Sequence, residues 1–321
     1  MDIPFEIVAA KEALEEPLLD AGLITGVDFG VRDEDEPDPE DLALRVFVAD
    51  LEDVPFEVQA AVDEFPFPVV LLQRVFTLTQ LPDVGRYRPV VGGVSVAASR
   101  FVPTGSVPVG TLGAIVTDQN DSKVVYGLSN HHVLCADLGR RRGDEIVQPE
   151  PGPFGSMPGD RVGTLHDWAF PETTGSGFVD AAIVRLEAAS VPEVAELGPV
   201  FGMVDETPAM LVTKRGRTTG QTFGWISGTG GSYALEYPRL PPVGPAGSFM
   251  RTMKNQIQIH IDFPQSIVFG ESGDSGSVVL DSDNHVVGLY WGSGSDSLGD
   301  PLRYGLATPA AAVQAALGIA F

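Results

Sequence analysis

A serine held between glycines at the entrance to an apolar run constrains the fold of this chain more than any other feature. Residues 270–277 read Gly-Glu-Ser-Gly-Asp-Ser-Gly-Ser, and the apolar run 278–280 follows at once. The flanking glycines tolerate backbone angles that other residues avoid, so the turn can be tight and a substrate can approach the main chain closely. The pattern predicts a rigid turn that exposes the Ser275 hydroxyl, although the same residue types also form ordinary turns between strands.

Two further segments supply the partners that a serine nucleophile needs. A serine at neutral pH requires a nearby base, and residues 128–134 (Leu-Ser-Asn-His-His-Val-Leu) carry two histidines into a short polar break. Asp180 stands at the mouth of a predicted buried strand, residues 181–186. The N–H groups of Gly273 and Ser275 could hold a developing oxyanion. The order His, Asp, Ser along the chain is that of a nucleophilic triad.

These three segments resemble the trypsin/chymotrypsin-like serine protease superfamily, whose patterns are a small-polar-x-His-[Val/Cys] segment, an Asp-[Ile/Leu]-Ala strand and Gly-Asp-Ser-Gly-Gly. The Asn-x-His-Val form and residues 305–309 (Gly-Leu-Ala-Thr-Pro) are similar to the HtrA-like and bacterial branches. Residues 214–224 (Lys-Arg-Gly-Arg-Thr-Thr-Gly-Gln-Thr-Phe-Gly) resemble a bacterial trypsin-like branch with an N-terminal extension, and no segment is left for a PDZ domain. The resemblance covers nearly the whole chain. It implies a mainly β fold of two six-stranded antiparallel β-barrels with a closing C-terminal helix over 310–317.

The resemblance also implies the roles of the triad residues. His132 is expected to be the base, because the histidine of the family directly precedes Val, while an exchange of roles with His131 stays open. Asp180 would hold the imidazole tautomer and stabilise the imidazolium. Asp167 and Asp262 are weaker substitutes for it. Ser275 would be the nucleophile, and the N–H groups of Gly273 and Ser275 would form the oxyanion hole.

Specificity is expected from three further positions. Phe269 falls where trypsins carry the aspartate that selects basic residues, so the resemblance implies a neutral, apolar pocket. Trp291 and Gly292 match the wall on which the substrate backbone pairs as an added strand. Arg303 could instead attract acidic residues. Ser277 departs from the family pattern, in which a second glycine is usual.

Three domains are predicted, at residues 1–85, 86–190 and 191–321. The first has an α-β-β-α-β pattern and reads as a small α+β domain separate from the two barrels. In secreted relatives a segment similar to residues 90–93 (Val-Val-Gly-Gly) becomes a new N-terminus that pairs with the aspartate before the catalytic serine. Because Pro89 blocks tryptic cleavage after the preceding arginine, we expect a permanent domain rather than a propeptide.

Composition excludes several classes of partner. The chain of 321 residues has 20 Lys and Arg against 44 Asp and Glu, a net charge of −24, which argues against stable contact with nucleic acid or an anionic membrane. The single cysteine, Cys135, cannot form an intramolecular disulfide, and its apolar neighbourhood favours a small buried residue over a catalytic thiol. The start of the chain lacks a signal-peptide pattern, so a cytoplasmic protein is expected. His166, His260 and His285 are scattered without an acidic partner, so no metal or other cofactor is expected.

The leading interpretation is a serine endopeptidase that hydrolyses protein or peptide substrates through an acyl-enzyme. The alternative is a non-catalytic trypsin-like scaffold or regulator that binds extended peptides, and a third is an enzyme held latent by its N-terminal domain. A complete triad favours the first interpretation, since a binding module has no need of all three groups. The sequence does not specify the substrate, the trigger or the oligomeric state, and a homo-oligomer is compatible with it.

Overall fold

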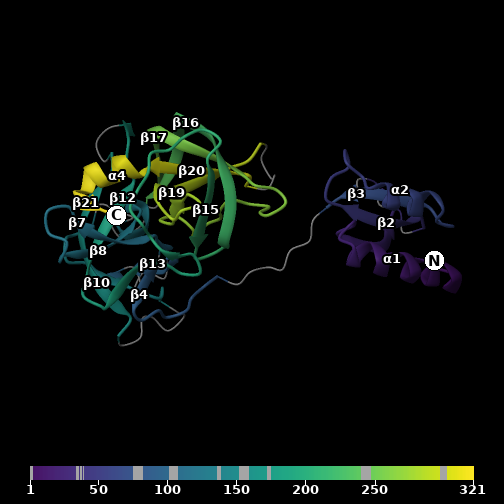
Figure 1. Ribbon diagram of the computed structural model, residues 1–321, viewed down its shortest axis with the longest axis horizontal. Coiled ribbons are helices and arrows are strands. Elements are labelled where there is room, and N and C mark those ends of the chain that lie inside the picture. Colours follow the sequence, from purple (N-terminus) through teal and green to yellow (C-terminus); the bar gives the residue numbers. More distant parts are fainter. Residues whose placement is uncertain are drawn as a thin grey trace. The chain divides into compact units, whose positions relative to one another are not determined.

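The computed structural model describes residues 3–33, 36, 38, 40–74, 82–100, 108–135, 139–151, 159–171, 175–239, 247–296 and 302–321. The chain divides into two compact units, Met1–Thr79 and Gln80–Phe321, and Figure 1 shows the elements of each. The division falls earlier than the expected boundary at residue 85, because Asp83 N–H donates to the Arg217 carbonyl (2.7 Å) inside the second unit. The separation of the second unit into two domains at residue 190 stays a prediction.

The first unit is a three-stranded sheet with two helices. Its strands lie in the order β1-β2-β3, with β1 and β2 antiparallel and β2 and β3 parallel. Its elements are α1 (Phe5–Asp20), β1 (Gly26–Val31), β2 (Leu42–Val48), α2 (Phe56–Asp63) and β3 (Val69–Gln73). Alternate residues of β2, such as Leu44 and Val46, are fully buried and pack with Val58 of α2. The α-β-β-α-β order is as the sequence predicts.

The second unit contains an eight-stranded sheet in the order β21-β7-β8-β12-β10-β9-β5-β6. Its strands are β5 (Val94–Ala98), β6 (Val109–Leu112), β7 (Ala114–Asp118), β8 (Val125–Ser129), β9 (Glu145–Val147), β10 (Arg161–Ala169), β12 (Ala181–Leu186) and β21 (Ile319–Ala320). Both faces of the strands near the centre are apolar, and residues such as Val96, Leu112 and Val184 have no exposed surface. They form one core with Leu134 of the short helix α3 (His131–Leu134).

This sheet closes into a barrel through Gly113. β6 pairs with β5, and β7 pairs with β8, while Gly113 is the single residue between them. The segment 109–118 is therefore one strand bent at a glycine, and it joins β5, β9, β10, β12 and β8 into a six-stranded ring. A Cβ on Gly113 would lie 2.1 Å from the Gly276 carbonyl oxygen, so only glycine fits where this barrel meets the turn that carries Ser275.

The second barrel closes through direct strand pairing. Strands β17-β16-β15-β18-β19-β20 follow one another in the sheet, and β20 pairs again with β17. The strands are β15 (Leu211–Gly216), β16 (Gly220–Arg239), β17 (Gly247–Ile261), β18 (Val278–Leu280), β19 (Val286–Gly294) and β20 (Tyr304–Pro309), and β11 (Ser176–Gly177) adds to the edge of β17. The prediction of two six-stranded barrels is confirmed.

The remaining elements join the barrels. β4 (Val90–Gly92), β13 (Ser190–Val194) and β14 (Gly198–Pro199) form a small sheet, so part of the segment between the two barrels is extended. The predicted closing helix is α4 (Ala310–Leu317), which ends at Gly318 in a left-handed conformation (φ 65°). β16 and β17 stay paired as a hairpin beyond the residues that pair with β15 and β20. In the described part of the chain, no helix has the length and apolar character needed to cross a membrane.

Candidate active site

The turn that carries Ser275 is tight because two glycines adopt positive φ angles. Gly273 has φ 101° and Gly276 has φ 98°, a region that side chains with a Cβ rarely enter. A Cβ on Gly276 would lie 2.2 Å from the Thr111 carbonyl oxygen and 2.3 Å from Ser129 Oγ. The second barrel therefore presents the serine directly against the first barrel, and both glycines are needed for that approach.

His132 and Asp180 form a close pair on the first barrel. His132 Nδ1 lies 2.6 Å from Asp180 Oδ2, and the His132 backbone N–H donates to Asp180 Oδ1 at 3.1 Å. Asn130 Nδ2 donates to the Asp180 carbonyl at 2.6 Å, which ties the start of α3 to the entrance of β12. Burial alone would raise the pKa of the fully buried Asp180 carboxyl, but the charge and hydrogen bonds of His132 reverse this and hold the pKa below its usual value. The aspartate therefore stays ionised while it accepts from the imidazole.

The environment of His131 differs from that of His132, so the structure distinguishes the two candidate bases. His131 is 6% exposed and stacks flat on Phe170, with ring centroids 4.3 Å apart and planes at 4°. Neither of its ring nitrogens has a hydrogen-bond partner among the residues that the structure describes, and burial lowers its pKa to about 3. His131 is therefore a neutral core residue, and it lies in the short helix α3. Of the substitute acids, Asp167 pairs with Arg142 instead (2.7 Å).

Ser275 is held near this pair by its backbone. Thr111 N–H donates to the Ser275 carbonyl at 2.8 Å. A Cβ placed on Gly110 would meet both that carbonyl oxygen (2.8 Å) and a Val133 methyl (2.4 Å), so the serine lies beside the residue that follows His132. The Ser275 hydroxyl itself donates to the Trp291 carbonyl at 3.5 Å, and within the described residues it has no hydrogen bond to His132. Catalytic hydrogen bonds are often long in unliganded enzymes and tighten when substrate binds.

The two predicted oxyanion donors are free to bind a ligand. Throughout the described segments, neither the Gly273 N–H nor the Ser275 N–H donates to a protein acceptor. The peptide carbonyl of Gly273 faces away and accepts from Thr111 Oγ1 at 2.9 Å, which fixes the orientation of the turn. Thr111 therefore anchors the turn at two carbonyls, at 273 and at 275. The sequence analysis missed this residue, because a threonine within an apolar strand carries no signal of such a role.

Asp274 is held inside the second barrel by a buried lysine. Lys214 Nζ lies 3.3 Å from Asp274 Oδ2, and neither side chain has any exposed surface. The same carboxylate accepts from Thr219 Oγ1 (2.7 Å) and from the N–H groups of Thr218 (2.8 Å) and Glu271 (2.9 Å). Burial would raise the pKa of Asp274, but Lys214 and these donors lower it below its usual value. Asp274, the residue before Ser275, is thereby fixed without any chain terminus.

Of the residues predicted to set specificity, Phe269 and Trp291 are buried, whereas Gly292 and Arg303 are at least partly exposed. Phe269 has no exposed surface, and its ring packs edge-on against Tyr290 at 5.8 Å beneath the turn, so in this structure it is a core residue rather than an open pocket wall. Trp291 is 4% exposed, and its indole N–H donates to Gln256 Oε1 at 2.8 Å. Gly292 is partly exposed on β19. Arg303 is exposed. A role in substrate binding stays a prediction for each of them.

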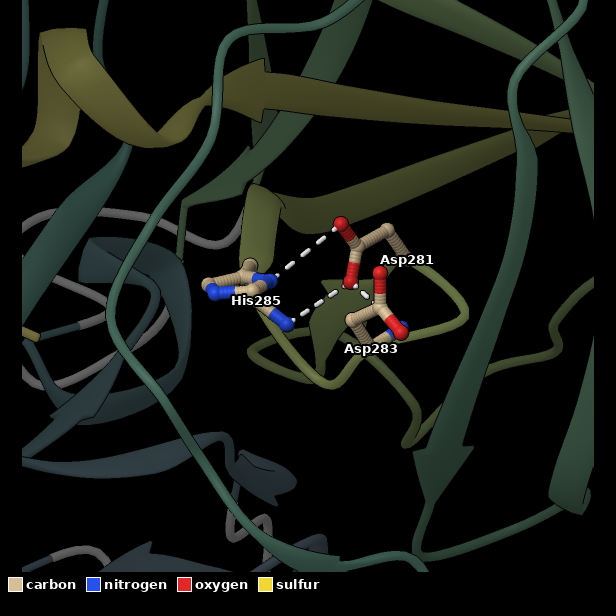
Figure 2. Close-up of side chains that lie close together, drawn as sticks. All are labelled: Asp281, Asp283 and His285. Carbon is tan, nitrogen blue, oxygen red and sulfur yellow. Dashed lines mark hydrogen bonds and ion pairs between the residues drawn. The ribbon is translucent and has the colours of Figure 1, made fainter.

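The expectation that His285 has no acidic partner is wrong. Figure 2 shows His285 facing Asp281 and Asp283 in the turn between β18 and β19, with His285 Nδ1 3.4 Å from Asp281 Oδ2. The ligand atoms of the three residues lie within 4.8 Å of one another. Asp281 Oδ1, however, already accepts the N–H groups of Asp283 (2.9 Å) and His285 (2.8 Å). The cluster therefore fixes a hairpin turn, as aspartates commonly do.

The chain is similar in structure to bacterial serine proteases. A Cellulomonas bogoriensis chymotrypsin is 20% identical, with a TM-score of 0.45 over 72% of this chain and 96% of that one. A serine protease specific for glutamic acid is 17% identical, with a TM-score of 0.48 over 72% and 99%. The active form of a protease from M. tuberculosis is 17% identical, with a TM-score of 0.42 over 77% and 92%. No protein-family model and no curated protein matches the sequence. The roles of individual residues therefore rest on the geometry of this site.

Proposed function

We propose that the chain is a serine endopeptidase that cleaves peptide bonds through an acyl-enzyme. The observation that carries the proposal is the 2.6 Å contact between His132 Nδ1 and the buried Asp180 carboxylate, placed on the first barrel beside the serine turn of the second. That contact fixes the tautomer in which Nε2 lacks a proton, so Nε2 can accept one. A histidine kept only for packing has no need of such an acid.

The first half of the reaction forms an ester on Ser275. His132 Nε2 removes the hydroxyl proton as the oxygen attacks the peptide carbonyl, and the carbonyl oxygen becomes an oxyanion bound by the N–H groups of Gly273 and Ser275. His132 then gives its proton to the leaving nitrogen, the C–N bond breaks, and an amine leaves. Each oxyanion donor of this kind contributes about 3 kcal/mol to lowering the barrier.

The second half repeats the cycle with water. His132 takes a proton from water as the hydroxide attacks the ester, and the same two N–H groups hold the second oxyanion. The proton then returns to Ser275 Oγ as the ester bond breaks and a carboxylic acid leaves. Asp180 remains ionised throughout and stabilises the imidazolium in both halves.

The proposed reaction requires the Ser275 hydroxyl to turn toward His132. In this structure the hydroxyl donates to the Trp291 carbonyl at 3.5 Å, a long contact that can be given up at little cost. Staggered serine rotamers interconvert easily when the side chain is partly exposed. A substrate backbone that pairs with β19 at Gly292 would compete for the Trp291 carbonyl and favour this rotation of the hydroxyl.

Activation needs no new N-terminus in this account. Lys214 already supplies the positive charge for Asp274, and Val90 is fully buried with its N–H donating to the Ala189 carbonyl at 2.8 Å. To pair with Asp274, a new N-terminal ammonium at Val90 would have to leave β4 and displace the buried Lys214. The N-terminal unit is therefore proposed to be a permanent domain that binds a partner or positions the enzyme. A cytoplasmic location is proposed from the sequence alone.

A peptide-binding scaffold is the second candidate, because Ser275 and His132 are not hydrogen-bonded here. Labelling by a fluorophosphonate probe separates the two functions, since only an activated serine reacts. We expect wild type to label, and Ser275→Ala and His132→Ala to lose the label. Ser272→Ala is the matched control, because Ser272 is an exposed serine on the same turn, and it should label like wild type. Absence of label in folded wild type, with or without residues 1–79, would favour the scaffold.

A further inference from the structure

The hairpin formed by β16 and β17 extends from the second barrel as an arm, which we define as residues 231–239 and 247–254. Three register shifts between Ile226 and Ser232 mark its base. On β16 the side chains alternate, as a strand requires. Tyr233 and Leu235 are partly buried, Tyr237 is buried, and the residues between them are exposed. The arm therefore has one covered face, and Tyr237 is its most deeply buried described side chain on β16.

The arm lies on the segment of the first barrel that leads into Asp180. Thr252 N–H donates to the Gly175 carbonyl at 2.8 Å, and Arg251 Nε donates to the Pro171 carbonyl at 2.7 Å. β11 pairs in parallel with Thr252 and Met253 of β17. These backbone contacts fix the arm relative to the buried aspartate across the boundary between the two barrels.

Tyr237 reaches the triad from this arm. Its ring is 6% exposed and stands edge-on to the His132 ring, with centroids 6.0 Å apart and planes at 70°. Phe170 at 5.1 Å and Phe249 at 6.0 Å enclose the other sides of the ring. The tyrosine therefore packs against the imidazole that holds Asp180, and its neighbours leave it little room to move.

The Tyr237 hydroxyl is buried beside the Asp180 carboxylate. Burial raises the pKa of this hydroxyl, and the charge of Asp180 raises it further, so it keeps its proton. It has no partner of normal hydrogen-bond geometry among the described residues, and a buried hydroxyl left in that state is destabilising. The carboxylate has capacity to accept, because Oδ1 and Oδ2 each accept one hydrogen bond, from His132 in both cases.

We propose that Tyr237 is a positioning residue for the triad, whose hydroxyl donates a hydrogen bond to the Asp180 carboxylate. This inference rests on the proposed peptidase function and names a residue that acts on it through Asp180. The donor would restrain the carboxylate from rotating and would share its negative charge. The carboxylate then draws the Nδ1 proton of His132 less strongly than it would alone. His131, His132 and Tyr237 face Asp180, and Arg251 of β17 is the charged neighbour of Tyr237.

Tyr237→Phe tests the inference, because it removes the hydroxyl and keeps the ring. Tyr233→Phe is the matched control, since Tyr233 lies on the same face of the same strand and Asp180 does not affect it. Proton NMR of the full chain reports the hydrogen bond between His132 Nδ1 and Asp180 without any need for catalysis. We expect its far-downfield signal to move further downfield in Tyr237→Phe and to stay in place in Tyr233→Phe.

Peptide hydrolysis supplies the second readout. In Tyr237→Phe, kcat should fall by about tenfold, as expected for loss of a hydrogen bond to a charged group, with KM little changed. The acid limb of the pH dependence of kcat/KM should move to higher pH, because an unshared carboxylate favours the imidazolium. A merely structural tyrosine would lower stability without moving that limb.

The two readouts keep the inference separate from the proposed function. A shifted NMR signal in Tyr237→Phe together with an inactive wild type would uphold the contact and overturn the peptidase. An active wild type, with Tyr237→Phe matching Tyr233→Phe in the NMR signal, in kcat and in the acid limb, would overturn the positioning role and leave the peptidase intact.

Discussion

Replacing Lys214 by methionine should destabilise the second unit strongly. At 3.3 Å from Asp274, the lysine charge contributes about 5 kcal/mol of attraction at an effective dielectric constant of about 20. Methionine keeps the length of the side chain and removes the charge, which leaves a buried carboxylate without its counterion. Breaking a buried pair in this way costs about 3–5 kcal/mol. Because the other hydrogen bonds to Asp274 remain in the variant, we expect a loss at the lower end of that range.

The loss of stability in Lys214→Met should depend on pH. Because the folded-state pKa of Asp274 lies below its usual value, the wild-type pair contributes stability above the unfolded pKa, and this contribution disappears as pH falls through the folded pKa. In the variant, burial is no longer opposed by the lysine, so Asp274 takes up a proton at higher pH. The difference in free energy of unfolding between wild type and Lys214→Met should therefore be widest near pH 7 and narrow toward pH 4.

Urea unfolding followed by tryptophan fluorescence measures this difference. The three tryptophans, at 168, 225 and 291, all lie in the second unit, so the signal reports that unit within the full chain. Lys254→Met is the matched control, because that lysine is exposed on β17. Adding Asp274→Asn to Lys214→Met should recover part of the loss. A Lys214→Met protein within 1 kcal/mol of wild type at pH 7, on the scale of an exposed ion pair, would refute the reasoning.

Three other changes test the packing around the site. Gly276→Ala should destabilise the second unit by more than about 3 kcal/mol in urea unfolding, because its Cβ would overlap two atoms of the first barrel. A variant as stable as wild type would contradict the close approach. Removal of residues 1–79 should leave the urea midpoint of the second unit unchanged. Removal of residues 1–88 should lower it, because Asp83 forms an ion pair with Arg215. Equal midpoints for the two deletions would contradict a stabilising role of residues 80–88. Cys135 should resist alkylation in the native protein, because burial removes access and raises the pKa of its thiol; rapid labelling seen by mass spectrometry would contradict its burial.

The sequence could propose the triad residues because they stand where local patterns change, and it could not show that they act together. His132 follows an apolar run, Asp180 and Ser275 each precede one, and their order supplied a strong constraint. His132 follows β8 and Asp180 precedes β12, so the pairing of the two side chains depends on these strands lying side by side in the barrel. The choice between His131 and His132 required the structure, since adjacent residues differ only in the direction that α3 gives them.

The residues that hold the site in place could not be predicted from the sequence, for physical reasons. Lys214 is fully buried, whereas lysines are almost always exposed, so its sequence context gave no reason to expect a counterion for Asp274. Phe269 was expected in a pocket by position, but tertiary packing turns its ring into the core. Tyr237 lies in a segment rich in glycine and proline. Its signal was the alternation of Tyr233, Leu235 and Tyr237, which is the period of a strand.

The acidic partner of His285 could have been predicted by reading local chemistry. Asp281 precedes His285 by four residues, so an acidic partner was visible in the sequence. The polar junction before the first barrel was expected to belong with the N-terminal domain. Its Asp83 instead accepts from Arg215, a long-range contact that no local pattern specifies.

The most direct test of the central claim is to observe an acyl-enzyme. The full chain would be mixed with an activated ester, quenched in acid within seconds and analysed by intact mass and peptide mapping. The account predicts one added acyl group, located on Ser275, that is absent in Ser275→Ala and formed far more slowly in His132→Ala. Hydrolysis of the ester with no adduct on Ser275, or an adduct that forms equally well without His132, would contradict it.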